Sequence, residues 1–244
     1  MTSDGEPLMG SGIQARHDAL TGVVGVLFDF DGPLCHLFAT TTAKYVANEL
    51  RAFINREGLP PVTSVPPEKR DSPLDILKGA VTEWGDTEAV KQLELHLTEW
   101  EHSAVVGAKE TDGAAQLVEA LWSVGIPMAI TTNNSVTAVR RHLDNCGMMY
   151  AFEGSIHGRL MGKGGPLRLK PDPDCIERAL EGIGPVDRDR ILMIGDSPDD
   201  VAAAESAAVR FLGFQNPDGN TGLQDAYPGL PLIHRLGDLV RGLA

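Results

Sequence analysis

Short apolar runs that end in polar residues alternate with stretches of helical spacing along most of this chain. The first run, Val23 to Phe28, is rich in β-branched residues and predicts a fully buried strand. Further apolar runs predict strands over 126–131, 190–194 and 209–214, with helices between them. Strands that alternate with helices are typical of a parallel sheet covered by helices on both faces. We therefore predict an α/β fold built on a doubly wound parallel sheet.

A long stretch between the first two strands contains only helical patterns. Apolar residues recur at helical spacing over 43–54, 74–84 and 90–100. Ser72 followed by Pro73 has the pattern of an N-cap and a first helical residue, and it predicts the start of the second helix. The stretch therefore predicts an all-helical insertion.

The position of this insertion predicts the domain organisation. A segment that leaves the carboxyl end of a parallel strand lies over the edge where such sheets build their binding sites. An insertion at this point therefore acts as a cap. We predict a disordered tail over 1–20, a Rossmann-like core of 21–35 and 106–244, and a helical cap domain over 36–105.

The composition of the chain argues against nucleic-acid and membrane partners. Apolar residues make up 42% of the chain, while 21 basic and 34 acidic residues give a net charge of −13. No stretch gathers Lys and Arg with aromatic residues, so the sequence lacks a nucleic-acid footprint. No apolar run approaches the ~18 residues that cross a bilayer. Three unclustered cysteines, of which Cys35 lies nearest to a candidate motif, are typical of reduced thiols. We expect a cytoplasmic protein without nucleic-acid or membrane partners.

Carboxylates follow two of the predicted strands. Asp29 and Asp31 end the first strand, and side chains two residues apart in a strand point the same way. Asp196 and Asp200 follow the strand over 190–194. Paired carboxylates at a buried strand end are costly unless a cation compensates them, and Mg²⁺ prefers oxygen ligands. Each pair by itself is also compatible with a turn or a helix cap.

Two further motifs could bind an anion. Thr132 and Asn133 follow a strand and precede a helix, whose exposed N–H groups attract anions, although simple capping explains them as well. Lys170 precedes Pro171, which holds it in an extended loop at a helix start. A lone lysine is usually solvated. The combination is more informative, because strand ends in a parallel sheet meet at one edge.

In this order the motifs resemble those of the haloacid dehalogenase superfamily: DFDG at Asp29, a Thr-Asn pair at Thr132, KPDP at Lys170 and GDSPDD at Asp196. They are separated by 103, 38 and 26 residues. The helical insertion resembles the first-position, or C1-type, cap of the phosphoglycolate-phosphatase-like and β-phosphoglucomutase-like branch. Pro33 stands where most members carry threonine. Lys163 is a second candidate for the third motif, and the Pro-Asp-Pro sequence favours Lys170.

The resemblance implies a magnesium-dependent phosphatase that acts on a small phosphorylated metabolite. Asp29 would attack phosphorus and become an aspartyl phosphate. Asp31 would serve as general acid and then as general base. Magnesium and the phosphoryl group would each have a set of ligands. The metal ligands would be Asp29, the backbone carbonyl of Asp31, Asp196 and Asp200. Asp200 would act through water or by steadying its neighbours. The phosphoryl group would be bound by Thr132, the Asn133 backbone N–H and Lys170.

Other activities share part of this pattern. A hydrolytic dehalogenase lacks the acid found at Asp31, whereas a sugar phosphomutase keeps every motif and is the main alternative. A non-catalytic phosphate-binding domain is a further one. A phosphonate hydrolase would need a Schiff-base lysine from the cap. The cap lysines are Lys44, Lys69, Lys78 and Lys91. Contributors to substrate specificity are sought in the cap, in a predicted loop over 153–169 and at His36, Leu37 and Arg140.

Overall fold

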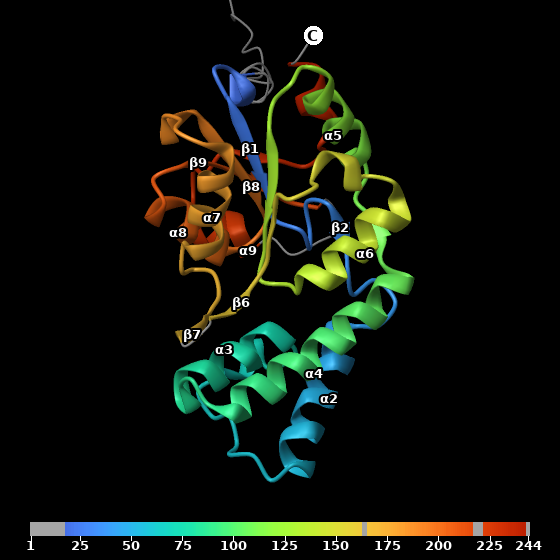
Figure 1. Ribbon diagram of the computed structural model, residues 1–244, viewed down its shortest axis with the longest axis vertical. Coiled ribbons are helices and arrows are strands. Elements are labelled where there is room, and N and C mark those ends of the chain that lie inside the picture. Colours follow the sequence, from blue (N-terminus) through green and yellow to red (C-terminus); the bar gives the residue numbers. More distant parts are fainter. Residues whose placement is uncertain (1–17, 163–164, 217–221, 243–244) are drawn as a thin grey trace, which may run out of the picture.

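The computed structural model describes residues 18–162, 165–216 and 222–242. Its centre is a parallel six-stranded sheet with the strand order β10-β9-β8-β1-β4-β5 (Figure 1). The strands are β1 (Gly25–Phe28), β4 (Met128–Thr131), β5 (Ile156–His157), β8 (Ile191–Gly195), β9 (Arg210–Phe214) and β10 (Leu232–Ile233). This confirms the predicted α/β fold and its parallel sheet. The short edge strands β5 and β10 were not predicted, because two residues carry no periodicity.

Both faces of the sheet are covered, because successive residues of a strand point to opposite sides. Val26 and Phe28 of β1 belong to one hydrophobic cluster, and Leu27 between them belongs to another. The first cluster includes residues of α5 (Ala114–Ser123), α6 (Val136–Cys146) and α10 (Gly237–Val240). The second includes residues of α7 (Asp174–Ile183) and α8 (Pro198–Ser206). The sheet is therefore doubly wound, as predicted.

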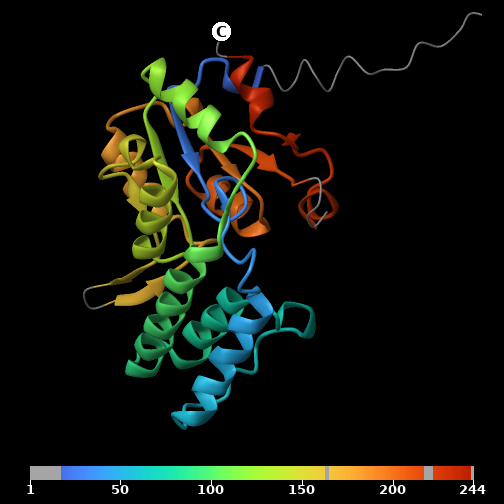
Figure 2. The ribbon, with the colours of Figure 1, turned by 90° about the vertical axis from the view of Figure 1, so that its right-hand side faces the viewer.

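Three helices form the cap between β2 (Cys35–His36) and β3 (Lys109–Glu110), which pair antiparallel where the chain leaves and re-enters the core. They are α2 (Ala43–Arg56), α3 (Pro73–Trp84) and α4 (Glu88–Ala104). Figure 2 shows them together on one side of the core. Pro73 is the first residue of α3, and the Ser72 hydroxyl accepts a hydrogen bond from the Asp75 N–H at 3.1 Å, as predicted. Leu50, Leu77 and Leu97 give the cap a hydrophobic core of its own.

The segment 153–169 is not the loop that we predicted. Besides β5 it contains an antiparallel hairpin of β6 (Leu160–Gly162) and β7 (Gly165–Arg168). The hairpin reaches the cap, where Leu167 is buried in the cap's hydrophobic core. Lys163 lies outside the described residues.

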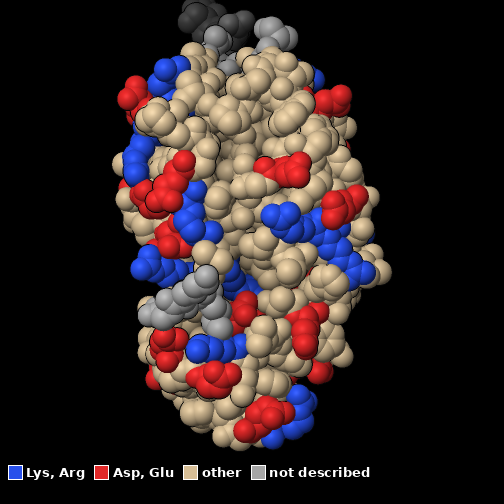
Figure 3. Space-filling model, viewed as in Figure 1, with Lys and Arg blue, Asp and Glu red and all other residues tan. Residues whose placement is uncertain are grey.

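The remaining domain predictions concern the chain end and the cap limits. Residues 1–17 lie outside the described residues, and Asp18–Leu20 form a 3₁₀ helix rather than part of a tail. The limits of the cap at 36 and 105 stay a prediction. Within the described residues, no helix has the length and apolar character to cross a membrane. On the face shown in Figure 3, basic and acidic side chains are interspersed over core and cap.

Candidate active site

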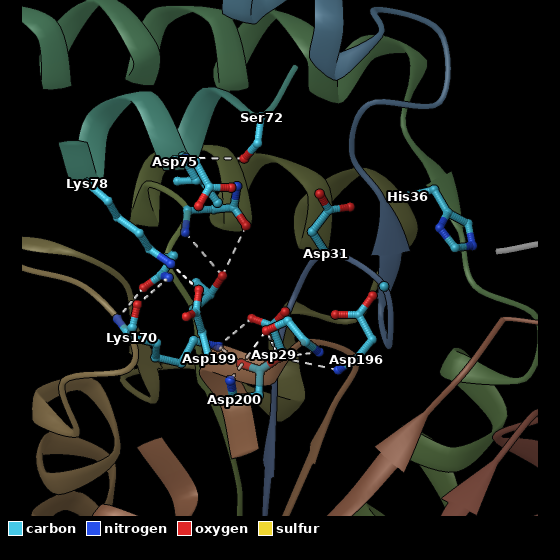
Figure 4. A pocket seen from close by; sticks show the side chains of 16 residues that line it. Asp29, Asp31, His36, Ser72, Asp75, Lys78, Lys170, Asp196, Asp199 and Asp200 are labelled. Carbon is cyan, nitrogen blue, oxygen red and sulfur yellow. Dashed lines mark hydrogen bonds and ion pairs between the residues drawn. The ribbon is translucent and has the colours of Figure 1, made fainter. Parts of the chain in front are cut away.

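Three carboxylates meet at the carboxyl edge of the sheet. Asp29 follows β1, and its N–H donates to the Ile194 carbonyl of β8 at 2.8 Å. Asp196 follows β8, while Asp200 reaches the same place from the first turn of α8. One carboxylate oxygen from each of the three lies within 4.8 Å of the others (Figure 4). The strand ends therefore bring together the acidic residues of the first and fourth motifs.

The turn after β1 allows this approach. Gly32 has φ +113°, and a Cβ atom there would lie 2.2 Å from Oδ2 of Asp196. A larger residue would displace Asp196 or strain the backbone. The hydrogen bonds within this turn are donated by Gly32, Leu34 and Cys35, so Pro33 can lack an N–H without losing any of them.

Lys170 is a buried cation in this site, with 2% of its surface exposed. Its Nζ atom lies 2.8 Å from Asp29 Oδ1 and 2.9 Å from the Thr131 carbonyl, and it also bonds Asp200. Burial alone would lower the pKa of Lys170, but the charges of Asp200 and Asp29 together keep that pKa above its ordinary value. Lys170 is therefore an ammonium, as an anion-binding role requires.

The second motif also fixes this lysine. The Asn133 side chain accepts a hydrogen bond from the Lys170 N–H at 2.7 Å and donates to the Lys170 carbonyl at 3.2 Å. The Thr132 hydroxyl accepts from the Asn134 N–H at 3.1 Å. Ser135 caps α6 by accepting from the Ala138 N–H. Capping therefore explains Ser135, while Thr132 and Asn133 line the site.

Asp31 differs from the other carboxylates in its position. Its side chain is turned toward the cap, and its Oδ1 accepts a hydrogen bond from the Leu37 N–H at 2.9 Å (Figure 4). Burial raises the pKa of Asp31 to about 7; the Leu37 N–H opposes this increase and the charge of Asp29 adds to it. A carboxyl with a pKa near neutrality can both give and take a proton.

The acidic cluster has the donor set of a hard divalent cation. Burial raises the pKa of Asp29 to about 6, although Lys170 lowers it. The protein around Asp196, together with the charges of Asp29 and Asp200, raises the pKa of Asp196 well above its ordinary value. One ammonium does not balance three carboxylates. Oxygen ligands with excess negative charge fit a divalent cation.

The site opens into a cavity of about 310 Å³ between core and cap. The cap contributes part of its wall, with Ser72, Leu74, Asp75 and Lys78. The Lys78 ammonium bonds Asp199 of the core across this cavity (Figure 4). Among the described lining residues, Lys78 and Lys170 are the lysines, and no arginine lines the cavity. The cap thus adds a cation to a cavity whose core side is lined by carboxylates.

Comparison with known proteins now decides the family. The haloacid dehalogenase-like hydrolase family matches residues 23–208. The chain belongs to the haloacid dehalogenase-like hydrolases. It is 27% identical to a phosphoglycolate phosphatase of Rhodospirillum rubrum over 75% of this chain and 76% of that protein. It is also 27% identical to a phosphoglycolate phosphatase of Cereibacter sphaeroides, over 90% and 98%. These relatives agree with the predicted phosphoric monoester hydrolase.

Solved structures show the same fold with a cap. CbbY from Rhodobacter sphaeroides in complex with phosphate has a TM-score of 0.64 at 19% identity and covers 91% of this chain and 99% of that one. A haloacid dehalogenase-like protein of Streptococcus pneumoniae has a TM-score of 0.59 at 16% identity, over 92% and 100%. The predicted fold, an α/β core with a helical cap, is thereby confirmed.

The residues expected to contribute to substrate specificity in this hydrolase differ in their positions. His36 lines the cavity, and its Nε2 lies 3.1 Å from the Asn216 amide nitrogen. Leu37 is buried and contributes its N–H to Asp31 without lining the cavity, and Arg140 is exposed on α6. Arg140 does not line the cavity, so the structure gives no support for its expected contribution to substrate specificity. Cys35 is buried and its pKa is raised well above the ordinary value, so it is an unreactive thiol.

The hydrolase also contains a buried charge cluster that sequence reasoning missed. Arg159, which precedes β6, is buried with Glu94 and Glu101 of α4. A signal was present, because both glutamates lie on the same helix face as Val90 and Leu97, within its buried stripe. Charged residues inside an apolar stripe indicate a buried partner.

Proposed function

We propose that this protein is a Mg²⁺-dependent phosphatase that hydrolyses a small phosphate monoester through an aspartyl phosphate on Asp29. One observation supports it above the others. Asp29 Oδ1 is held 2.8 Å from Lys170 Nζ, beside the carboxylates of Asp196 and Asp200, while Asp31 is turned toward the cap. A nucleophile, a cation and a separate acid are thus arranged around one cavity.

In the first step Asp29 attacks phosphorus, the bond to the leaving oxygen breaks, and Asp31 gives its proton to that oxygen. In the second step water attacks phosphorus and gives a proton to Asp31, the bond between phosphorus and the Asp29 oxygen breaks, and the Asp29 carboxylate and inorganic phosphate are released. Thr132, the Asn133 N–H and Lys170 would hold the phosphoryl oxygens in both steps.

The metal would be held by the carboxylates of Asp29 and Asp196 and by the backbone carbonyl of Asp31. When bound, magnesium neutralises charge on the phosphoryl group. Asp200 has little free capacity, since its Oδ2 accepts from the Ser197 N–H at 3.0 Å and hydroxyl at 2.7 Å, and its Oδ1 bonds Lys170. These contacts support a role for Asp200 through water or as a positioning residue.

Phosphate release from a panel of monoesters tests this proposal. We expect turnover in the presence of Mg²⁺ and a loss of at least about 100-fold after chelation, restored by adding Mg²⁺. The measurement is inorganic phosphate formed over time, with circular dichroism to show that the chelated protein stays folded. Release that is unaffected by chelation would contradict the metal dependence, and no release from any ester would contradict the phosphatase.

For the substrate we propose a small acidic phosphate ester, with 2-phosphoglycolate as the first candidate. The cavity is at the small end of ligand sites, which span roughly 300–1,000 Å³. Lys78 can donate three hydrogen bonds, so it can contact a substrate carboxylate while it remains near Asp199. The names of the relatives favour the same substrate.

Replacing Lys78 by methionine is expected to raise KM for 2-phosphoglycolate by about 10- to 100-fold, because a charge-assisted contact to the carboxylate is lost. The kcat value should change little, since Lys78 lies on the cap side of the cavity. KM for p-nitrophenyl phosphate, which has no carboxylate, should change less. Steady-state kinetics with both esters make the measurement.

Lys91→Met is the matched control, because Lys91 belongs to the same cap and does not line the cavity. It should leave KM for both esters unchanged. An equal increase in KM for both esters with Lys78→Met would contradict recognition of the carboxylate and indicate a general effect on the cap.

Two alternatives have direct tests. A sugar phosphomutase would isomerise a hexose 1-phosphate, and this reaction would depend on a bisphosphate primer. Phosphate release without any isomer would exclude the mutase. A phosphonate hydrolase would form a Schiff base, and Lys78 is the one cap lysine among the described residues that lines the cavity. Borohydride trapping with a carbonyl substrate should label Lys78 in that case and leave it unlabelled in a phosphatase.

We propose a cytoplasmic setting for this activity. Cys35, Cys146 and Cys175 are all free in the structure, as expected of a reducing compartment. The buried positions of Cys35 and Cys175 also protect them from oxidation.

A further inference from the structure

Arg159 is the centre of a buried network that no motif includes. Its side chain is fully buried, with Nε 2.9 Å from Glu94 Oε1, Nη1 2.8 Å from Glu101 Oε1 and Nη2 2.8 Å from the Thr98 hydroxyl. All three acceptors lie on one face of α4, the cap helix whose end lies beside α6 of the core (Figure 1). One planar guanidinium thus holds this helix at three points.

The same network holds the second motif. Arg159 Nη1 donates to the Asn133 carbonyl at 2.8 Å. Glu101 accepts from the Asn134 amide nitrogen at 3.0 Å through Oε1, and from the Ser135 N–H at 2.9 Å through Oε2. The Ser135 N–H lies at the positive end of α6, which helps to balance the second carboxylate. Each side-chain nitrogen of Arg159 therefore bonds α4 or the loop 132–135, and both carboxylate oxygens of Glu101 accept from that loop.

Two of these contacts determine where the Thr132 hydroxyl lies. The peptide between Asn133 and Asn134 is planar, so Arg159 on its carbonyl orients its N–H, which donates to Thr132 Oγ1 at 3.1 Å. The Asn134 side chain forms the second link. Its amide nitrogen is held by Glu101, which turns its oxygen toward Thr132 Oγ1 at 3.0 Å. Both routes end on a hydroxyl that lines the cavity.

A purely stabilising role does not explain the arrangement. Replacing a buried ion pair by apolar residues is often neutral or stabilising, so such a pair is weak evidence for stability. The two glutamates also differ in a way that stability does not require. Glu94 contacts Arg159 and Thr98, whereas Glu101 contacts Arg159 and the loop as well.

We propose that Glu101 and Arg159 are positioning residues that hold the loop 132–135 in its phosphate-binding geometry and fix it to the cap helix α4. This inference rests on the proposed function, because it assumes that Thr132 and the Asn133 N–H bind phosphate. The geometry of the loop then depends on the placement of α4, and a change in the helix is transmitted to the phosphate site through Glu101.

Glu101→Gln and Glu94→Gln are a matched pair of variants on one helix. Each variant removes the negative charge of one glutamate that contacts Arg159. Only Glu101→Gln leaves the Asn134 side-chain amide or the Ser135 N–H without an acceptor. We expect Glu101→Gln to weaken inhibition by orthovanadate, a phosphate analogue, by about tenfold or more and to lower kcat. Glu94→Gln should keep the inhibition constant within about threefold. Both variants should bind Mg²⁺ as the native protein does.

The outcomes separate the two proposals. Equal effects of the two variants on orthovanadate inhibition, or no effect of Glu101→Gln, would overturn the positioning role. A loss of Mg²⁺ binding in parallel with phosphate binding would overturn it too, since it indicates general distortion. If Glu101→Gln does not fold, Arg159→Lys, which keeps the charge and loses the planar fork, is measured in the same way. A native protein that neither releases phosphate nor responds to orthovanadate would overturn the proposed function itself.

Discussion

Replacing Asp29 by asparagine is expected to lower kcat by on the order of 10⁴-fold or more, because the amide cannot form the covalent phosphoryl intermediate. Asn is nearly isosteric with Asp and can keep a hydrogen bond with Lys170, whose ammonium also retains Asp200. The cavity should therefore keep its shape. Inorganic phosphate release measures the loss, and the native protein with labelled substrate should show phosphate bound to Asp29 after rapid denaturation.

The same substitution has a predictable effect on stability. The pKa of Asp29 is raised by burial to about 6, from the ordinary value of 3.8. The folded state therefore holds a proton that the unfolded chain releases, and stability falls as pH rises from about 4 to about 6. Asparagine carries no such charge. At neutral pH, Asp29→Asn should unfold at the same temperature as the native protein or a higher one.

Asp172→Asn is the matched control, because Asp172 lies two residues from Lys170, is exposed, and accepts a hydrogen bond from the N–H of Asp174 rather than from a group of the site. It should retain native turnover. Substantial phosphate release by a folded Asp29→Asn protein would exclude Asp29 as the nucleophile. A lower unfolding temperature for that variant would indicate that the carboxylate stabilises the fold instead.

The strands and the position of the acidic residues were predictable for a common reason. A buried run such as Val23–Phe28 is recognisable from its apolar residues, and the residues after it must lie at the carboxyl edge of a parallel sheet. Asp29 and Asp196 could therefore be placed together without knowledge of any contact. Lys170 was placed by its motif, and the structure shows it bonded to Asp29.

The contacts that fix the site were not predictable from periodicity. Arg159 and Glu101 are 58 residues apart, and nothing local indicates that they pair. The Asn133 side chain bonds the backbone of Lys170, which is 37 residues away in the sequence, whereas the motif indicates a role only for the Asn133 N–H. Such contacts arise when the cap, the hairpin and the sheet pack together. Sequence patterns specify elements and edges, whereas tertiary packing decides which side chains meet.

Replacing Asp31 by asparagine is expected to reduce kcat for an alkyl phosphate by about 10²–10⁴-fold, the usual contribution of a general acid and base. A phenolate leaving group needs no proton, so p-nitrophenyl phosphate should still phosphorylate Asp29. The variant should then release one equivalent of p-nitrophenolate rapidly and hydrolyse the intermediate slowly. Stopped-flow absorbance measures this burst. Asp75→Asn, which changes a carboxylate on the cap wall of the same cavity, should retain turnover.

The pH dependence tests the same role in the native protein. Asp31 must be protonated to act as the acid, and burial raises its pKa to about 7, so kcat/KM for an alkyl phosphate should fall as pH rises through about 7. For p-nitrophenyl phosphate this alkaline decrease should be absent from the phosphorylation rate, because that step needs no acid. An equal decrease for both esters would contradict the assignment, since it would point to a group that binds the phosphoryl moiety common to them. A burst followed by rapid turnover in Asp31→Asn would show that another group activates the water, and the acid and base roles would then belong to different residues.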